Sequence, residues 1–300
     1  MATSSGAMKS AAKQSSVARG SGTGLAAIDQ IHGARRFGRY LLLTLMGVIV
    51  LFPIYVMVVG AFKPGDKVLD QPLLPSHFTF STISDAWHDG HLGRALINSA
   101  VVSIIVTLAQ LVTSVLAAYA FVFLKFPGRT VLFVLFLATL LVPLEATLTV
   151  NRRTMQSFGW INSYQGLAVP FLATAFGIFM IRQVFLQIPK EMREAASMDG
   201  LGHIGFLREV AVPLSRPTIA ALAVFAFLTS WNQYLWPVLI TTDEDYNTVQ
   251  TGLKSLKQAS LDQPNLVIAG TVVVALPIVA ILISFQRQLV RGLTAGAVKG

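Results

Sequence analysis

Six long apolar runs dominate this sequence and restrict its fold more than any other feature. About 20 apolar residues in a helix cross a hydrocarbon layer roughly 30 Å thick, and backbone groups in lipid must pair within their own segment. The sequence therefore predicts an all-α integral membrane protein with six transmembrane helices. The runs lie at 41–62, 100–124, 131–150, 165–181, 218–240 and 266–285, and the fourth is the shortest.

The composition excludes several classes of protein. Hydrophobic residues make up 54% and charged residues 12% of the chain, whereas about a quarter of a soluble domain is charged. Because the sequence contains no cysteine, disulfides, thiolate metal sites and cysteine nucleophiles are excluded. The five histidines show no metal-ligand spacing on one helix face, which argues against a membrane metalloenzyme: His32, His77, His88, His91 and His203.

The distribution of charge predicts the topology. Most of the 23 lysines and arginines fall in segments that share one side if the amino terminus is cytoplasmic, and the acidic residues concentrate in the other loops. The positive-inside rule then places both termini in the cytoplasm. The formal charge of +9 is therefore a topology signal, and we expect no nucleic-acid partner. Residues 1–34 are predicted to be a disordered cytoplasmic tail, and 35–300 the transmembrane domain.

A polar cytoplasmic insert at 182–217 interrupts the apolar pattern. Pro189 suits the first turn of a helix over 190–199, and Gly200 supplies a left-handed stop. A second short helix over 204–211 is expected to run until Pro213 and Pro217 turn the chain back into the bilayer. The insert is thus predicted to form two short helices joined by a bend.

The side chains of the insert are typical of a docking surface. The small residues Ala195 and Ala196 permit a close approach, and Glu194 and Asp199 can pair with basic residues of a partner. We expect Phe206, Leu207 and Val210 to present an apolar face. The alternative is an amphipathic loop that lies on the lipid headgroups.

The insert resembles the EAA loop of ABC importer permeases. The pattern Glu194-Ala195-Ala196-x-x-Asp199-Gly200 is followed at the family's offsets by Phe206, Val210, Val212-Pro213 and Pro217. Residues 35–300 as a whole are similar to the MalG-type branch of the carbohydrate-importer permeases. Within that branch, Pro143-Leu144-Glu145 and the segment from Trp231 to Pro237 look most like the subunits of glycerol-3-phosphate and glycerophosphodiester importers. Further matching motifs are Leu96-Ile97-Asn98-Ser99, Ala118-Tyr119-Ala120-Phe121, Phe126-Pro127-Gly128 and the carboxyl-terminal stretch from Gln286 to Gly300.

The resemblance implies a type I ABC importer permease fold and a set of partners. These are a second permease subunit that completes a heterodimeric pore, two ATP-binding subunits, an extracytoplasmic solute-binding protein and the lipid bilayer of a prokaryotic cell membrane. The chain has no phosphate-cradling G-x-x-x-x-G-K-[ST] motif, so it is expected to be a transport subunit without catalytic residues or cofactors, with ATP and Mg²⁺ at the partner ATPases. The ATPase-coupling residues would be Glu194, Ala195, Ala196, Asp199, Gly200, Phe206, Val210 and Pro213.

Two groups of polar residues near apolar runs are candidates for the solute pathway. Intramembrane charges are costly and usually face a pathway or a partner. Glu145 either pairs with Arg152 or Arg153 or meets the cationic choline of a phosphodiester. The second group either lines the pathway or anchors the helix ends: Asn232, Gln233, Tyr234 and Trp236.

The acidic external loop at 241–265 contains Asp243, Glu244, Asp245 and Asn247. It is either a solvated connector or, as the resemblance implies, a segment that faces the binding protein. The predicted function is import of glycerol 3-phosphate or glycerophosphodiesters. Di- or oligosaccharides are the alternative solutes, and an ion-coupled secondary transporter is the alternative class, although Glu145 alone supports the latter poorly.

Overall fold

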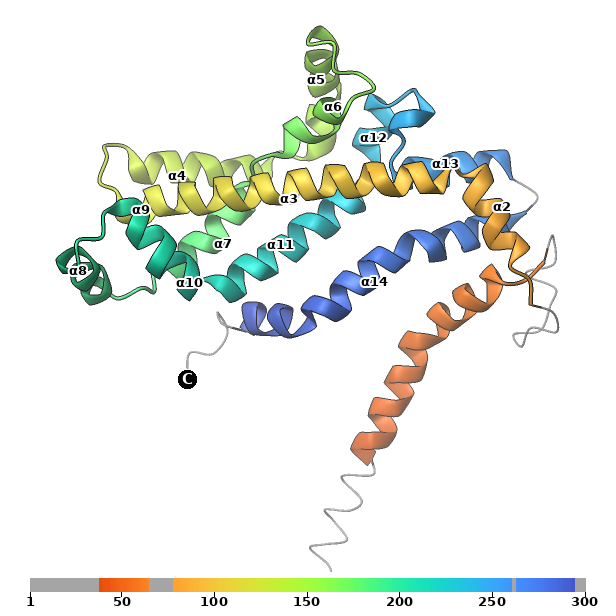
Figure 1. Ribbon diagram of the computed structural model, residues 1–300, viewed down its shortest axis with the longest axis horizontal. Coiled ribbons are helices and arrows are strands. Elements are labelled where there is room, and N and C mark those ends of the chain that lie inside the picture. The colour runs from red at the N-terminus through yellow and green to blue at the C-terminus, as the bar shows by residue number, and fades with distance from the viewer. Residues whose placement is uncertain (1–37, 65–77, 261–262, 295–300) are drawn as a thin grey trace, which may run out of the picture. The chain divides into compact units, whose positions relative to one another are not determined.

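The computed structural model describes residues 38–64, 78–260 and 263–294, with side chains as far as residue 287. Every regular element within these ranges is a helix, which confirms the all-α prediction for them (Figure 1). The chain divides into two compact units at residues 57 and 58. The helix Gly38–Ala61 continues through this boundary, and the predicted tail at 1–34 lies outside the described residues.

Helix α3 (Leu92–Phe123) is the central element of the second unit. Its 32 residues extend about 48 Å at 1.5 Å per residue. Helices α7 (Ala175–Phe185) and α11 (Arg216–Trp231) pack along it, and α14 (Pro264–Thr294) packs on α11. Small residues permit close packing, as in other membrane helix bundles. A Cβ at Gly177 of α7 would collide with the hydroxyl of Ser114 of α3.

The structure contains three helices long and apolar enough to cross a membrane, within the described ranges. These are Gly38–Ala61, Leu92–Phe123 and Pro264–Arg287. Three further helix pairs meet the same criteria but are bent at short breaks, so the number of spans reaches six if each bent pair is one span. The first, second and sixth predicted runs therefore correspond to continuous helices.

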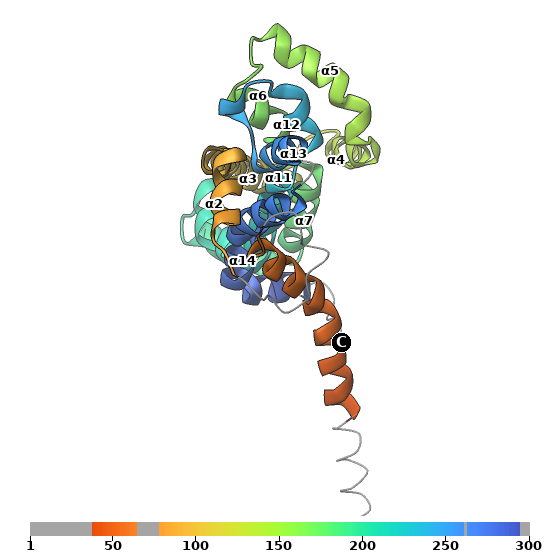
Figure 2. The same ribbon diagram turned by 90° about the vertical axis from the view of Figure 1, so that its right-hand side faces the viewer.

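The third run, predicted at 131–150, is not one helix. It consists of α4 (Arg129–Ala138) with the 3₁₀ turn η1 (Thr139–Leu141), and of α5 (Leu144–Ser157), which meet at 98°. Val142 is extended, with φ −83° and ψ 114°, because the ring of Pro143 disfavours a helical conformation in the residue before it. Figure 2 shows α5 diverging from α4.

The fourth and fifth runs are also interrupted. Helix α6 (Tyr164–Ala168) with η2 (Val169–Phe171) meets α7 at 45°. The fifth run, predicted to continue to residue 240, is broken after Trp231, and the short helix α12 (Leu235–Ile240) follows. Side chains of α3 bind carbonyl groups at the break before α7: Gln110 Nε2 donates to Phe171 O at 2.8 Å, and Thr113 Oγ1 donates to Leu172 O at 3.1 Å.

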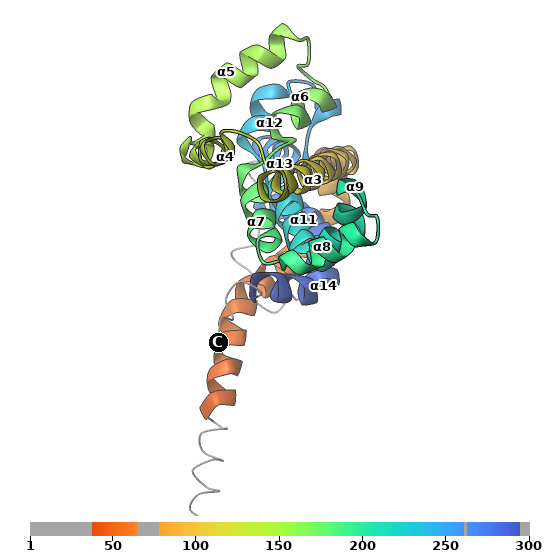
Figure 3. The same cartoon turned by 90° about the vertical axis from the view of Figure 1, so that its left-hand side faces the viewer.

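The remaining short elements gather at the two ends of α3 (Figures 1 and 3). Near Phe123 lie α8 (Lys190–Met198), α9 (His203–Phe206), the π-helical turn η3 (Leu207–Ala211) and α10 (Val212–Leu214). Near Leu92 lie α2 (Ser81–Asp89), η4 (Glu244–Tyr246) and α13 (Val249–Ala259). The candidate functional residues occur in both groups.

Candidate functional site

The segment from Lys190 to Leu214, here called the hairpin, forms two short helical arms joined at Gly200. Gly200 has φ +80°, a left-handed conformation that glycine adopts without a Cβ penalty. The N–H of Leu201 donates to Ala196 O at 2.9 Å, and that of Gly200 donates to Ser197 O at 3.1 Å. These two bonds form a Schellman motif, which ends α8 and reverses the chain. The predicted helix and its glycine stop are thus confirmed.

The inner face of the hairpin is an aromatic cluster that includes the carboxyl-terminal turns of α3. The Phe206 ring lies 5.2 Å from that of Phe123, centroid to centroid, in an edge-to-face arrangement. Tyr119 forms a 2.9 Å hydrogen bond with Nδ1 of His203. The guanidinium of Arg193 lies 5.8 Å from the centre of the Phe123 ring, within the range of a cation–π interaction. The hairpin is therefore attached to α3 from both of its arms.

Phe206, Leu207 and Val210 form an apolar face, as expected, but this face packs against the chain itself, with Phe206 buried and the other two half-buried. Phe206 is only 3% exposed, and the other two side chains pack against the same buried cluster. Ala196 is buried as well. The amphipathic second arm turns its apolar side to the core of the chain itself, because burying an aromatic ring stabilises the fold more than leaving it exposed.

The outer face of the hairpin contains different apolar residues, which the sequence reasoning missed. Met198 is 83% exposed and Ile204 is 81% exposed, and they flank the bend at Gly200. Glu194, Ala195 and Asp199 are also exposed. The sequence did contain a signal for this exposed apolar surface. Two large apolar residues stand beside a tight polar bend, where burial, their usual environment, is difficult.

The hairpin joins α11 through a sharp bend. The sequence predicted that the second arm ends at Pro213. In the structure Pro213 instead lies in the first turn of α10, where a missing N–H is tolerated. The bend of 79° follows at Ser215, and Pro217 lies in the first turn of α11. The π-helical turn η3 precedes this bend, and such turns are frequent at functional sites.

At the other end of α3, a hydrogen-bond network holds the segment from Thr241 to Val249. This segment is the first part of the external loop predicted at 241–265, the rest of which contains α13, and it alone is called the acidic loop from here on. Asn98 is completely buried. Its Nδ2 donates to Asp245 O and to Asn247 O, both at 2.8 Å, and its Oδ1 accepts from the hydroxyl of Tyr164 at 2.7 Å. The neighbouring Ser99 accepts the N–H of Val249 at 2.9 Å.

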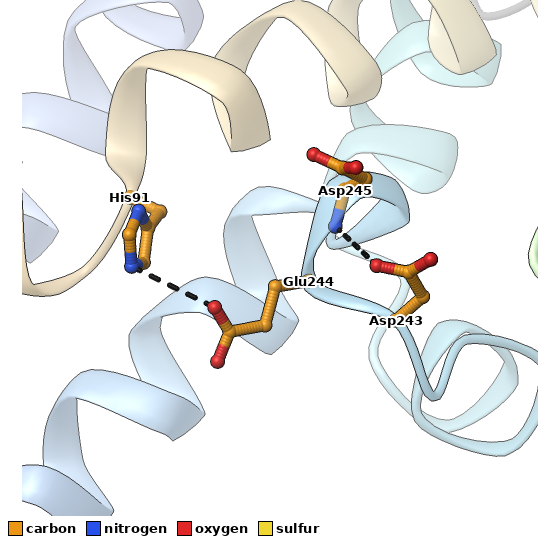
Figure 4. A network of polar contacts seen from close by, with 4 residues as sticks. All are labelled: His91, Asp243, Glu244 and Asp245. Atoms are coloured by element: carbon orange, nitrogen blue, oxygen red, sulfur yellow. Dashed lines mark hydrogen bonds and ion pairs between the residues drawn. The ribbon is translucent and has the colours of Figure 1, made fainter.

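The acidic loop is fixed from a second side by the segment between α5 and α6. Asn162 has φ +53°, and its Oδ1 accepts the backbone N–H of Thr242 at 2.7 Å and that of Asp243 at 3.2 Å. Figure 4 shows the carboxylates of this loop. Asp243 accepts the N–H of Asp245 at 3.0 Å, and Glu244 lies 3.6 Å from Nε2 of His91. The side chains of Asp243, Glu244 and Asp245 remain exposed, whereas Asn247 is half-buried.

The candidate pathway residue Glu145 is exposed in the first turn of α5. Of the two alternatives for this residue, the ion pair with Arg152 or Arg153 does not occur within the described part of the chain. Arg152 instead donates from Nε to Leu239 O of α12 at 2.9 Å. A carboxylate at a helix amino terminus is stabilised there by the helix dipole.

The aromatic and amide cluster divides into a buried and an exposed part. Trp236 is fully buried, and its Nε1 donates to Gly166 O at 3.0 Å. Trp236 is therefore packed inside the chain and is not exposed on its surface. Asn232 and Tyr234 are exposed and Gln233 is half-buried at the break between α11 and α12. The side chain of Asn232 donates to Leu228 O at 2.9 Å and so ends α11.

Comparison with known proteins matches residues 99–295 to a family described as binding-protein-dependent transport system inner membrane component. Two relatives are sn-glycerol-3-phosphate transport system permease proteins named UgpE. The protein from Yersinia enterocolitica is 36% identical over 255 residues, which cover 82% of this chain and 91% of the relative. The protein from Agrobacterium fabrum is 36% identical over 265 residues, which cover 85% of this chain and 94% of the relative.

Solved structures show the same fold. One is a bacterial ABC transporter involved in the import of the acidic polysaccharide alginate, with a TM-score of 0.72, 24% identity, and coverage of 84% of this chain and 96% of that chain. Another is a bacterial alginate ABC transporter in complex with an alginate pentasaccharide-bound periplasmic protein, with a TM-score of 0.55, 15% identity, and coverage of 83% and 94%. At these identities the likeness concerns the fold alone.

Proposed function

Because the chain belongs to the family of binding-protein-dependent transport system inner membrane components, we propose that it imports glycerol 3-phosphate or glycerophosphodiesters. It acts as the permease subunit of an ATP-driven importer and passes the solute from a binding protein into the cytoplasm. The observation that carries the proposal is the identity of 35–36% to sn-glycerol-3-phosphate permeases over more than four fifths of the chain.

The proposed complex contains a second permease subunit, two ATP-binding subunits and an extracytoplasmic solute-binding protein. Support for the binding protein comes from the family description and from a periplasmic protein bound to one structural neighbour. In this arrangement the chain crosses the membrane six times, each bent pair counts as one span, and both termini are cytoplasmic. The excess of basic residues near the hairpin supports that orientation.

The hairpin is the proposed coupling element to the ATPase. Its exposed surface around Glu194, Ala195 and Asp199, with Met198 and Ile204 beside them, docks on an ATP-binding subunit. Gly200 and Pro213 shape the hairpin, whereas Ala196, Phe206 and Val210 attach it to α3. Closure of the ATPase dimer around Mg²⁺ and ATP moves the hairpin, and the contacts with Tyr119 and Phe123 pass this motion to α3.

The acidic loop is proposed to face the binding protein with Asp243, Glu244, Asp245 and Asn247. The pathway is proposed to pass Glu145, Asn232, Gln233 and Tyr234, which expose a carboxylate, two amides and an aromatic hydroxyl at helix breaks. Amide and hydroxyl groups suit the hydroxyl groups of a glycerol moiety. The buried position of Trp236 argues for a supporting role there.

Uptake measurements test the solute. Proteoliposomes that contain the complete complex, its binding protein and enclosed ATP are given radiolabelled glycerol 3-phosphate, glycerophosphocholine or a disaccharide. We expect accumulation of the first two solutes and none of the disaccharide. Accumulation of the disaccharide alone would favour an oligosaccharide importer, and uptake driven by an ion gradient without ATP would favour a secondary transporter.

The variant Glu194→Lys tests the coupling role. Glu194 is exposed, so the substitution is expected to change the stability of the chain by less than about 0.5 kcal/mol. It reverses a charge at the proposed ATPase contact, so transport is expected to stop while the complex still assembles in the membrane. Glu191→Lys makes the same change on another exposed residue of α8 and shows whether the effect is specific. Normal transport by Glu194→Lys would refute the assigned contact.

A further inference from the structure

The buried amide of Asn98 links three segments that are far apart in the sequence. Through Nδ2 it binds the backbone carbonyls of Asp245 and Asn247 on the acidic loop, and through Oδ1 it accepts the hydroxyl of Tyr164 on α6. Its hydrogen-bonding capacity toward the protein is thereby used on both sides of the amide. A buried network that is fully satisfied in this way fixes one geometry, because any alternative leaves polar groups unpaired.

The bonds from Asn98 to the acidic loop end on main-chain carbonyls, so they control where the loop lies rather than which side chains it carries. The exposed carboxylates of Asp243 and Glu244 are thus presented on a backbone held at Asp245 and Asn247. Arg94, one turn earlier on α3, adds a 3.3 Å bond from Nε to Asp245 O. The first turns of α3 therefore determine the position of the acidic loop.

We propose that Asn98 is a positioning residue that holds the acidic loop in the conformation to which the solute-binding protein docks. This inference rests on the proposed function. Asn98 itself is completely buried within the chain. It acts through the main chain of residues 245–247, and Tyr164 orients its amide so that both N–H groups point at the loop.

Two substitutions separate the hydrogen bonds that Asn98 donates to the loop from the one that it accepts from Tyr164. Asn98→Asp keeps the size of the side chain and an oxygen that accepts from Tyr164, but it removes both donors to the loop. Tyr164→Phe keeps the donors and removes only the hydroxyl that orients the amide. Asn151→Asp is the matched control, because among the described residues the amide of Asn151 on α5 donates a single 3.4 Å bond, to Thr147 of the same helix.

The position of the loop is measured first, independently of transport. The chain has no native cysteine, so Glu244→Cys, at a side chain that is 75% exposed, gives a single site for a nitroxide label in lipid nanodiscs. The loss of two buried hydrogen bonds is expected to lower the ratio of ordered to mobile label by about tenfold or more in Asn98→Asp. Tyr164→Phe should give a smaller change and Asn151→Asp none. Unchanged label mobility in Asn98→Asp would overturn the proposal.

Docking is measured by uptake of radiolabelled glycerol 3-phosphate at increasing concentrations of the solute-binding protein in proteoliposomes. Weaker docking in Asn98→Asp is expected to raise the concentration needed for half-maximal uptake about tenfold and to leave the maximal rate close to that of the unmodified chain. A lowered maximal rate with an unchanged half-saturation concentration would contradict the positioning role. If the unmodified chain transports no glycerol 3-phosphate, the proposed function fails, whereas the label measurement still decides whether Asn98 holds the loop.

Discussion

The hairpin and the acidic loop lie at opposite ends of α3 (Figure 1) and are held by different kinds of contact. The hairpin is attached mainly by the burial of Phe206 against Phe123 and Tyr119. The acidic loop is attached mainly by hydrogen bonds that Asn98 donates to its carbonyls and by one that Ser99 accepts from the N–H of Val249. One helix therefore has two kinds of attachment. At one end, Phe123 and Tyr119 make an apolar contact with Phe206, here called the aromatic joint. At the other end, Asn98 and Ser99 form hydrogen bonds to the acidic loop, here called the polar clamp.

This difference matches the tasks that we assign to the two regions. Hydrophobic contact has no preferred direction, so aromatic surfaces can rotate or slide by a small amount without losing most of their stabilisation. Hydrogen bonds weaken steeply when their angles change, so the clamp holds a single arrangement. A segment that is moved by an ATPase suits the first kind of attachment, and a segment that must present a fixed surface suits the second.

Truncation of the aromatic joint is the largest predicted effect. Phe206→Ala is expected to lower the free energy of unfolding by about 3–5 kcal/mol, because it removes a buried ring and leaves a cavity. Ile204→Ala, two residues earlier and 81% exposed, should change it by less than about 0.5 kcal/mol. Thermal unfolding in nanodiscs and limited proteolysis of the hairpin measure both variants. Equal stability losses would show that the hairpin is not attached through its inner face.

A smaller effect is expected at the bend of the hairpin. A Cβ at Gly200 would have nothing within 4 Å, so Gly200→Ala is destabilised only by its φ of +80°. The expected loss in unfolding free energy is about 1–2 kcal/mol. Gly202→Ala is the control, since its Cβ is equally free and its φ is −73°. Chemical denaturation compares the two, and a loss of the same size in both would exclude the left-handed conformation as the cause.

The smallest effect is predicted for the single hydrogen bond of Ser99 to the acidic loop. Ser99→Ala leaves the N–H of Val249 without its partner, and we expect a loss of about 1–2 kcal/mol or less. Ser103, one turn further along α3, is buried but has no hydrogen-bond partner among the described residues. Ser103→Ala is therefore expected to be neutral or stabilising. Hydrogen exchange at Val249 should increase in Ser99→Ala alone, and an increase in both would show that α3 is disturbed as a whole.

The helical class and the hairpin were predictable from the sequence because they depend on local signals. Apolar runs of sufficient length define membrane helices, and Gly200 at the end of a polar helix marks a left-handed stop. The bend at Val142 had a local signal in Pro143, but the length of the apolar run concealed it. Because proline restricts the residue before it, Val142 is extended and the chain bends there despite the length of the apolar run.

The contacts within the candidate sites could not be derived in the same way. Phe206 is buried because it packs against Phe123 and Tyr119, which lie more than 80 residues earlier in the sequence. The periodicity of apolar residues predicts an apolar face, but it cannot tell whether that face packs on the chain's own core or on a partner. The bonds of Asn98 to the acidic loop span about 150 residues. The burial of Trp236 likewise depends on Gly166. These features arise from tertiary packing.

The energy source for transport is the central claim, and it is tested directly by accumulation of radiolabelled glycerol 3-phosphate in proteoliposomes that contain the complete complex and its binding protein. Vesicles enclose either ATP with Mg²⁺ or a non-hydrolysable ATP analogue with Mg²⁺. We predict accumulation against the gradient with ATP and none with the analogue. Equal accumulation under both conditions would contradict the account.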